Sequence, residues 1–192
     1  MWIFGYGSLV WKVDFSYKRK ITGYIKGFSR RFWQASIDHR GVPENPGRVV
    51  TLVPSDNLED KVWGVAYEIT DDRDIEKLNH REKRYELAQE VLFTSLCGTI
   101  QLNVNLFVGN CNGPLFLGPA SVEVIASQVV KAHGPSGTNV EYVLRLAEFM
   151  RTCCPGEEDE HLFEVETLIV KMVSNNKPSP SESEGFVRKF QF

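Results

Sequence analysis

The sequence predicts an α+β fold, a small mixed β-barrel or sheet flanked by helices. Short β-branched and aromatic runs, bounded by turn residues, dominate the chain up to Val108 and are typical of strands. One helical segment interrupts these runs, and from Val122 onward apolar residues recur at helical spacing. Strands gathered in one part of the chain and helices in another indicate a mostly antiparallel sheet, because parallel sheets alternate the two.

The strand segments follow one another with short connections. Gly23 and Gly27 are the expected bend points of the second segment, and the turn-rich residues 38–48 are expected to form a loop. We expect strands at residues 2–5, 21–37, 48–53, 62–69, 90–95 and 100–108.

A single helix is predicted among the strands. Ile75 and Leu78 mark its apolar face, and Thr70 or Asp71 can cap its start. We expect this helix over residues 71–84 and three further helices around residues 122–130, 140–147 and 158–172.

The length of 192 residues is natural for one domain. Residues 174–184 are polar and rich in Pro and Ser, and such a composition does not bury enough apolar surface to fold. We therefore expect one domain over residues 1–173 and a disordered tail over residues 174–192.

The composition excludes several classes of partner. A net charge of −3 provides no electrostatic surface for nucleic acid or an anionic membrane. No apolar run reaches the roughly 18 residues that span a bilayer. The apolar start of the chain lacks the basic segment of a signal peptide and is interrupted by glycines. The sequence therefore predicts a cytoplasmic protein.

The four cysteines form no CxxC pair, and the four histidines form neither HxxxH nor HExxH. Reduced, structural thiols are the expectation for such cysteines in a reducing compartment. The sequence therefore predicts no metal and no cofactor.

The segment Phe4-Gly5-Tyr6-Gly7-Ser8-Leu9 directly follows the first strand. Two closely spaced glycines allow a sharp turn whose backbone N–H groups can bind a carboxylate or an oxyanion. A tight turn without function is the alternative. Val10 occupies the place of a third glycine and no helical pattern follows, so the segment is not a dinucleotide-binding fingerprint.

Three other segments carry candidate chemistry. Glu82 lies between basic residues and is either catalytic or part of a solvated face. Arg40 and Arg48 flank a loop, where they can hold a substrate carboxylate or form surface ion pairs. Ser136 or Thr138 can cap the helix that follows residues 134–137. The absence of G-x-S-x-G argues against a serine hydrolase.

Taken together, these segments resemble the ChaC-type glutathione-specific γ-glutamylcyclotransferases. The matches come in order over residues 1–172. They are FGYGSLVW at 4–11, RRFWQ at 30–34, DHRG at 38–41, PGRVVTL at 46–52, WGVAY at 63–67, LNHRE at 78–82, LGPA at 117–120, GPSGTNVEY at 134–142 and DEHL at 159–162.

The resemblance implies a γ-glutamylcyclotransferase-like fold and assigns roles to residues. Glu82 corresponds to the catalytic glutamate, Arg40 to the arginine of the HRG motif, and Tyr142 to the tyrosine of the NxEY motif. Lys83 and Arg84 stand where many members carry glycines. The loop that cradles the γ-glutamyl group corresponds to Ile3, Phe4, Gly5, Tyr6, Gly7, Ser8 and Leu9.

The activity implied by the resemblance is that of a lyase, which cleaves glutathione to 5-oxoproline and cysteinylglycine. Leu9 and Trp11 favour the glutathione-specific branch over the branch that prefers other γ-glutamyl dipeptides. The alternatives are a cyclotransferase for other γ-glutamyl-amino acids or γ-glutamylamines and a non-catalytic γ-glutamyl-binding protein. We expect a monomer or weak dimer.

Overall fold

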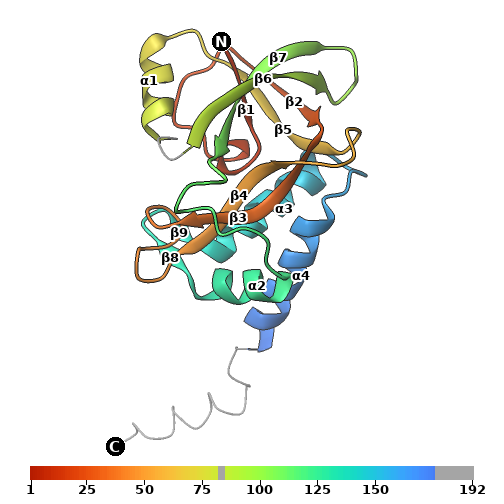
Figure 1. Ribbon diagram of the computed structural model, residues 1–192. Coiled ribbons are helices and arrows are strands. Elements are labelled where there is room, and N and C mark those ends of the chain that lie inside the picture. The colour runs from red at the N-terminus through yellow and green to blue at the C-terminus, as the bar shows by residue number, and fades with distance from the viewer. Residues whose placement is uncertain (82–84, 176–192) are drawn as a thin grey trace, which may run out of the picture.

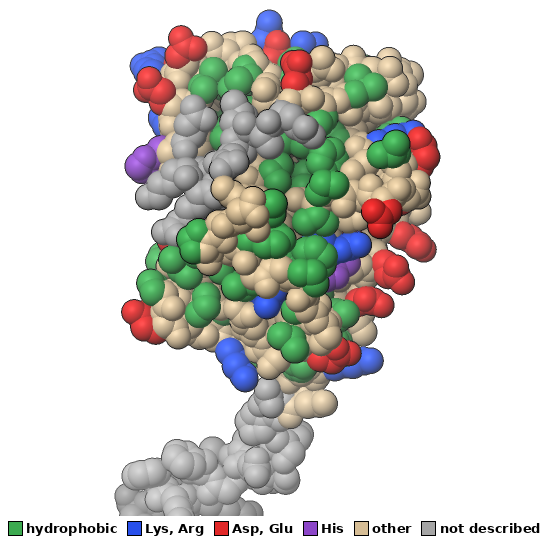
Figure 2. Space-filling view, viewed as in Figure 1, with side chains coloured by type: hydrophobic (Ala, Val, Ile, Leu, Met, Phe, Trp, Pro, Cys, Tyr) green, Lys and Arg blue, Asp and Glu red, His purple; other side chains and the backbone are tan. Residues whose placement is uncertain are grey.

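The computed structural model describes residues 1–81 and 85–175. Figure 1 shows a β-barrel at one end, helices at the other, and a two-stranded hairpin between them. On the face seen in Figure 2, hydrophobic side chains cover much of the middle, and most charged side chains lie toward the rim. The predicted α+β class, with a small mixed barrel flanked by helices, is confirmed.

Five strands close the barrel. They are β1 (Trp2–Gly5), β5 (Lys61–Glu68), β2 (Arg19–Lys26), β6 (Tyr85–Ser95) and β7 (Gln101–Gly109), in that spatial order. β7 returns to β1 in a parallel pairing, whereas the other neighbours are antiparallel. Phe4, Ile25, Phe93 and Leu106 are almost fully buried, so alternate side chains fill the core as the strand period of two requires.

The hairpin of β3 (Phe28–Ser36) and β4 (Gly47–Pro54) is separate from the barrel sheet. Gly27 joins β2 to β3 with a φ of 79°, so it is a bend point as predicted. Gly23 is not a bend point, and that prediction was wrong. It lies within β2, where a Cβ atom would come 2.2 Å from the carbonyl oxygen of Thr94. Close strand approach is the reason for this glycine.

Four helices complete the fold. They are α1 (Asp72–Arg81), α2 (Val122–Lys131), α3 (Asn139–Cys153) and α4 (Glu160–Asn175). Ser121 caps α2 and Thr138 caps α3, each accepting a hydrogen bond from a first-turn N–H. α2 and α3 contact β4, and α4 contacts β3, so the hairpin lies between helices and barrel (Figure 1).

Three short elements were not predicted. A single 3₁₀ turn, η1 (Ser8–Val10), follows β1, where no helical pattern was expected. The two-residue strands β8 (His133–Gly134) and β9 (Gly137–Thr138) precede α3. In the described part of the chain, every helix falls short of the length and apolar character that a membrane span requires.

Candidate active site

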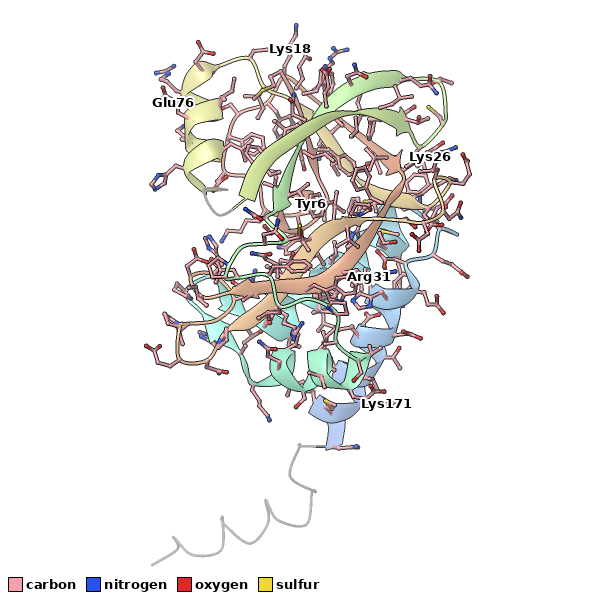
Figure 3. All side chains as sticks on the ribbon, viewed as in Figure 1. Tyr6, Lys18, Lys26, Arg31, Glu76 and Lys171 are labelled. Atoms are coloured by element: carbon pink, nitrogen blue, oxygen red, sulfur yellow. The ribbon has the colours of Figure 1, made fainter. Side chains whose placement is uncertain are left out.

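A cavity of about 460 Å³ lies where the barrel, the β3–β4 hairpin and the start of α3 meet. Figure 3 shows Tyr6 at this junction. The lining residues are Phe4, Gly5, Tyr6, Gly7, Ser8, Leu9, Lys12, Asp14, Gln34, Ala35, Ser36, Asp38, His39, Arg40, Val49, Val50, His80, Phe107, Ser136 and Tyr142.

The turn after β1 forms one wall of the cavity. Neither Gly5 nor Gly7 has a positive φ, so backbone handedness does not explain the two glycines. The limited space explains them, because a Cβ atom on Gly5 would lie 2.6 Å from Leu9 Cβ, and one on Gly7 would lie 2.9 Å from Tyr142 Oη. The Tyr6 hydroxyl donates a hydrogen bond of 2.6 Å to the carbonyl of Phe107 and ties the turn to β7.

Tyr142 contributes to the same wall from the first turn of α3. Its side chain is buried, and its hydroxyl accepts a hydrogen bond from the Val50 N–H at 3.3 Å. The Trp11 ring packs edge-on against it with centroids 5.3 Å apart. The hairpin and η1 therefore fix the position of this tyrosine.

Arg40 lines the cavity, but its guanidinium group donates its hydrogen bonds to other residues of the protein. Its Nη1 donates to Glu141 Oε2 at 2.6 Å and to the carbonyl of Thr138 at 3.0 Å. The hydrogen bond from Arg40 lowers the pKa of the Glu141 carboxyl, and the positive charges of Arg40, Arg145 and Lys12 add to this effect. Arg40 therefore joins the loop at residues 38–41 to the start of α3.

Arg48 does not line the described cavity. Its Nε donates to Gln128 Oε1 at 2.7 Å, its Nη1 donates to the carbonyl of Phe32 at 3.0 Å, and burial lowers its pKa. Asn139 fastens the same strand, accepting from the Arg48 N–H and donating to the Arg48 carbonyl. These contacts give Arg48 a structural position between β4 and the helices.

Glycines of the recognised motifs allow the cavity loops to approach one another. A Cβ atom on Gly41 would lie 2.0 Å from the Gly47 nitrogen, and one on Gly134 would lie 2.3 Å from the His39 carbonyl oxygen. The Ser136 N–H donates to that same carbonyl at 2.9 Å. The HRG and GPSG segments, far apart in sequence, thus form one rim.

Most of the substrate-binding residues expected from the sequence meet at this cavity. Phe4, Gly5, Tyr6, Gly7, Ser8, Leu9, Arg40 and Tyr142 line it. Ile3 has no exposed surface in β1 and is absent from the lining. Glu82 lies outside the described residues, although His80, two positions before it, lines the cavity.

The sequence did not single out other polar residues of the cavity. They include Lys12, Asp14, Gln34 and His80. The one sequence signal for Gln34 is its place in the motif at residues 30–34, because the buried register of β3 also holds Arg30 and Ser36. Within residues 1–81 and 85–175, no cluster of three or more His, Cys, Asp or Glu residues could hold a metal ion.

Comparison with known proteins agrees with this arrangement. The family model described as ChaC-like protein matches residues 1–172. A zebrafish (Danio rerio) protein named glutathione-specific gamma-glutamylcyclotransferase 1 is 46% identical over 90% of each chain. The human (Homo sapiens) protein of that name is 42% identical over 84% of this chain and 75% of its own. A solved yeast γ-glutamylcyclotransferase specific to glutathione superposes with a TM-score of 0.80 at 30% identity, covering 89% of this chain and 96% of its own. The chain therefore belongs to the ChaC-like protein family.

Proposed function

We propose that this protein is a glutathione-specific γ-glutamylcyclotransferase, a lyase that converts glutathione into 5-oxoproline and cysteinylglycine. The observation that carries the proposal is the meeting of the family's motif residues at one cavity, in a chain 42% to 46% identical to relatives that bear this name. The cavity volume of about 460 Å³ is within the range of small-molecule sites.

The reaction needs no nucleophile from the enzyme. The α-amine of the substrate attacks its own γ-carbonyl carbon, a five-membered lactam forms, and the C–N bond to cysteinylglycine breaks. The protein must hold the tripeptide in a curled near-attack conformation, which lowers the barrier by positioning alone. A concave site with walls from three parts of the fold suits this task.

The proton transfers need one group that faces both nitrogens. An α-amino group titrates near about 8, so at neutral pH it must lose a proton before it attacks. We assign Glu82 as the base that accepts this proton and as the acid that returns it to the leaving nitrogen. Its described neighbours support the assignment, because His80 lines the cavity and Tyr85 begins β6 opposite Gly109.

The turn after β1 supplies the complementary electrostatics in this proposal. Backbone N–H groups at residues 5–8 would hold the α-carboxylate or stabilise the oxyanion of the tetrahedral intermediate. Arg40 holds the facing loop through Glu141 and Thr138. The cytoplasmic location, the monomeric or weakly dimeric state and the independence from cofactors stay predictions.

The test is to mix the purified protein with reduced glutathione and measure 5-oxoproline by mass spectrometry. We expect product from glutathione at a much higher rate than from γ-glutamylalanine. We expect Glu82→Gln to fold normally, to bind glutathione and to lose about 10² to 10⁴ in turnover, the usual contribution of general acid–base catalysis.

The matched control is Glu76→Gln. Glu76 is exposed on the outer side of α1, the helix that precedes Glu82 (Figure 3). It should keep the wild-type rate. Thermal stabilisation by glutathione without any 5-oxoproline would instead indicate a binding protein, and faster turnover of γ-glutamylalanine would indicate the broader cyclotransferase activity.

A further inference from the structure

Gln34 is a polar side chain buried in the wall of the cavity. It comes from β3, is 3% exposed and lines the cavity beside the turn after β1. Its carboxamide oxygen Oε1 is enclosed and has no hydrogen-bond partner among the described residues. Buried carboxamides in native proteins are nearly always hydrogen-bonded, because an unpaired one is destabilising.

The lack of a side chain at Gly109 leaves space for the Gln34 carboxamide. A Cβ atom at position 109 would lie 2.5 Å from Gln34 Oε1 and 3.0 Å from Thr51 Oγ1, so any larger residue there would displace the Gln34 carboxamide. The Thr51 hydroxyl accepts a hydrogen bond from the Gly109 N–H at 3.2 Å. The end of β7 is thus arranged around the carboxamide without bonding to it.

The position of Gln34 relative to the proposed reaction centre is informative. Tyr6 is bound to Phe107, and Gln34 adjoins Gly109, two residues further along the same strand. Gly109 also pairs with Tyr85, the first described residue after Glu82. Gln34 therefore adjoins the end of β7 that pairs with Tyr85 and that holds Tyr6 through the Phe107 carbonyl.

We propose that Gln34 is the positioning residue that accepts a hydrogen bond from the α-amino group of the γ-glutamyl substrate. A half-turn about its terminal bond exchanges the oxygen and nitrogen of the carboxamide without changing its shape, so the acceptor can face the cavity. This inference rests on the proposed function and adds to it the group that orients the nucleophile.

A neutral acceptor suits the chemistry better than a carboxylate at this position. A second carboxylate beside the amine, in addition to the proposed base Glu82, would raise the pKa of the amine further and favour the protonated form, which has no lone pair for attack. An amide carbonyl directs the amine toward the γ-carbonyl and leaves the proton free to pass to the base. The proposal therefore explains why glutamine rather than glutamate occupies the site.

The test compares Gln34→Met, which keeps the length but not the hydrogen bond, with Gln34→Glu. We expect Gln34→Met to lower kcat/KM for glutathione by about 10- to 100-fold, the value of one hydrogen bond to a charged group. For Gln34→Glu we expect the acidic limb of the pH–rate profile to move to higher pH. A residue that only supports the fold would not move that limb.

Two unreactive ligands isolate the amine. Glutarylcysteinylglycine lacks the α-amine, whereas β-aspartylcysteinylglycine keeps it but closes no five-membered lactam. Calorimetry should show that Gln34→Met weakens binding of the second by about 10-fold and leaves binding of the first within about 2-fold. Equal weakening of both ligands, or of neither, would overturn the proposal.

Trp33→Phe is the matched control. Trp33 is the neighbour of Gln34, and its enclosed Nε1 also has no partner in the described part of the chain, but it does not line the cavity. Its replacement should leave the kinetics unchanged. An inactive wild-type protein would refute the proposed function, whereas an active wild type with a fully active Gln34→Met would refute only the role of Gln34.

Discussion

The two ends of β3 both bury polar side chains, but they do so against different surroundings. At one end, Arg30 is packed between the barrel and the loop before α4. At the other, Gln34 and Ser36 face the cavity, and the strand leads into the loop that carries Arg40. Both ends of the strand carry polar groups that have no hydrogen-bond partner among the described residues.

The Arg30 end is a junction within the protein. Its Nη2 donates to the carbonyl of Trp63, and its Nη1 lies 3.3 Å from Asp159 Oδ2. That ion pair lacks hydrogen-bond geometry, so Nη1 has no hydrogen-bond partner among the described residues. The same is true of Nε. We interpret the contacts of Arg30 as fastening the start of α4 to the barrel and the hairpin.

The contrast teaches how to interpret an unpaired buried polar group. Arg30 does not line the described cavity, so its incomplete bonding is a cost carried by the fold. Gln34 borders the cavity, so a half-turn of its carboxamide can present the oxygen to a ligand. If this distinction holds, substitutions at the Arg30 end should lower stability, and substitutions at the cavity end should lower catalytic activity.

The largest effect on stability is expected from Arg30→Met. The change removes the donor to the Trp63 carbonyl and the buried positive charge that faces the partly buried Asp159 carboxylate. We expect a loss of about 3 kcal/mol in the free energy of unfolding, or roughly 6 to 12 °C in Tm. Activity per folded molecule should stay within about 2-fold of wild type, because Arg30 does not line the cavity.

Urea unfolding and steady-state kinetics on the same preparations check this outcome. Arg19→Met is the control, since Arg19 forms an exposed ion pair with Glu68 and should change stability by less than about 1 kcal/mol. A variant at Arg30 that loses turnover without losing stability would erase the distinction between the two ends.

Arg40→Met should lower catalytic activity more than stability, whereas Arg30→Met should do the reverse. Its partner Glu141 is 46% exposed, so water can hydrate that carboxylate, and the expected loss of unfolding free energy is about 1 kcal/mol. The loop at residues 38–41 loses its tie to α3, and we expect kcat/KM for glutathione to fall about 10- to 100-fold.

Arg145→Met is the control for Arg40. Arg145 lies on the same helix as Glu141 but forms an exposed pair with Glu148 at 3.2 Å. Kinetics of the two variants should differ by at least about 10-fold. Comparable kinetics would show that the Arg40 contacts do not matter for the site.

The fold was largely predictable because its signals are local. Period-two runs identified the strands, and helical spacing identified α2, α3 and α4. The elements that were missed have no such signal. η1 is a single turn held by a bond from the Val10 N–H to the Gly7 carbonyl, and the closure of the barrel by β1 and β7 joins distant segments. Long-range pairing of this kind leaves no periodic mark in one sequence.

The site was predictable through motifs and not through physical pattern alone. Tyr142 came from the resemblance alone and Arg40 from the resemblance and its place beside a loop, whereas Asn139 and Glu141 were given no role. Their roles depend on partners about 90 to 100 positions away, Arg48 and Arg40. The burial of Gln34 could not be predicted locally either, because Arg30 and Ser36 share its buried register in β3.

The smallest expected effect is a pH dependence at the Arg30 end. His161 Nε2 accepts a hydrogen bond of 3.2 Å from the Phe32 N–H, which requires the neutral ring. Burial, together with the charge of Arg31, lowers the pKa of His161 from 6.5 to about 4, although Asp159 opposes the shift. The unfolded chain therefore binds more protons between these values, so stability falls as the pH drops from 6.5 toward 4 and is unaffected by this residue above 6.5.

Because the ring is only partly enclosed, we expect the loss to be about 1 to 2 kcal/mol. His161→Gln keeps an acceptor but does not titrate, so the difference in unfolding free energy between wild type and variant should change between pH 7 and pH 4.5. Taking the difference cancels the titration of carboxylates common to both proteins. A difference that stays constant over this range would mean that the junction at Arg30 does not hold His161 neutral, and that the far end of β3 is less tightly packed than its contacts indicate.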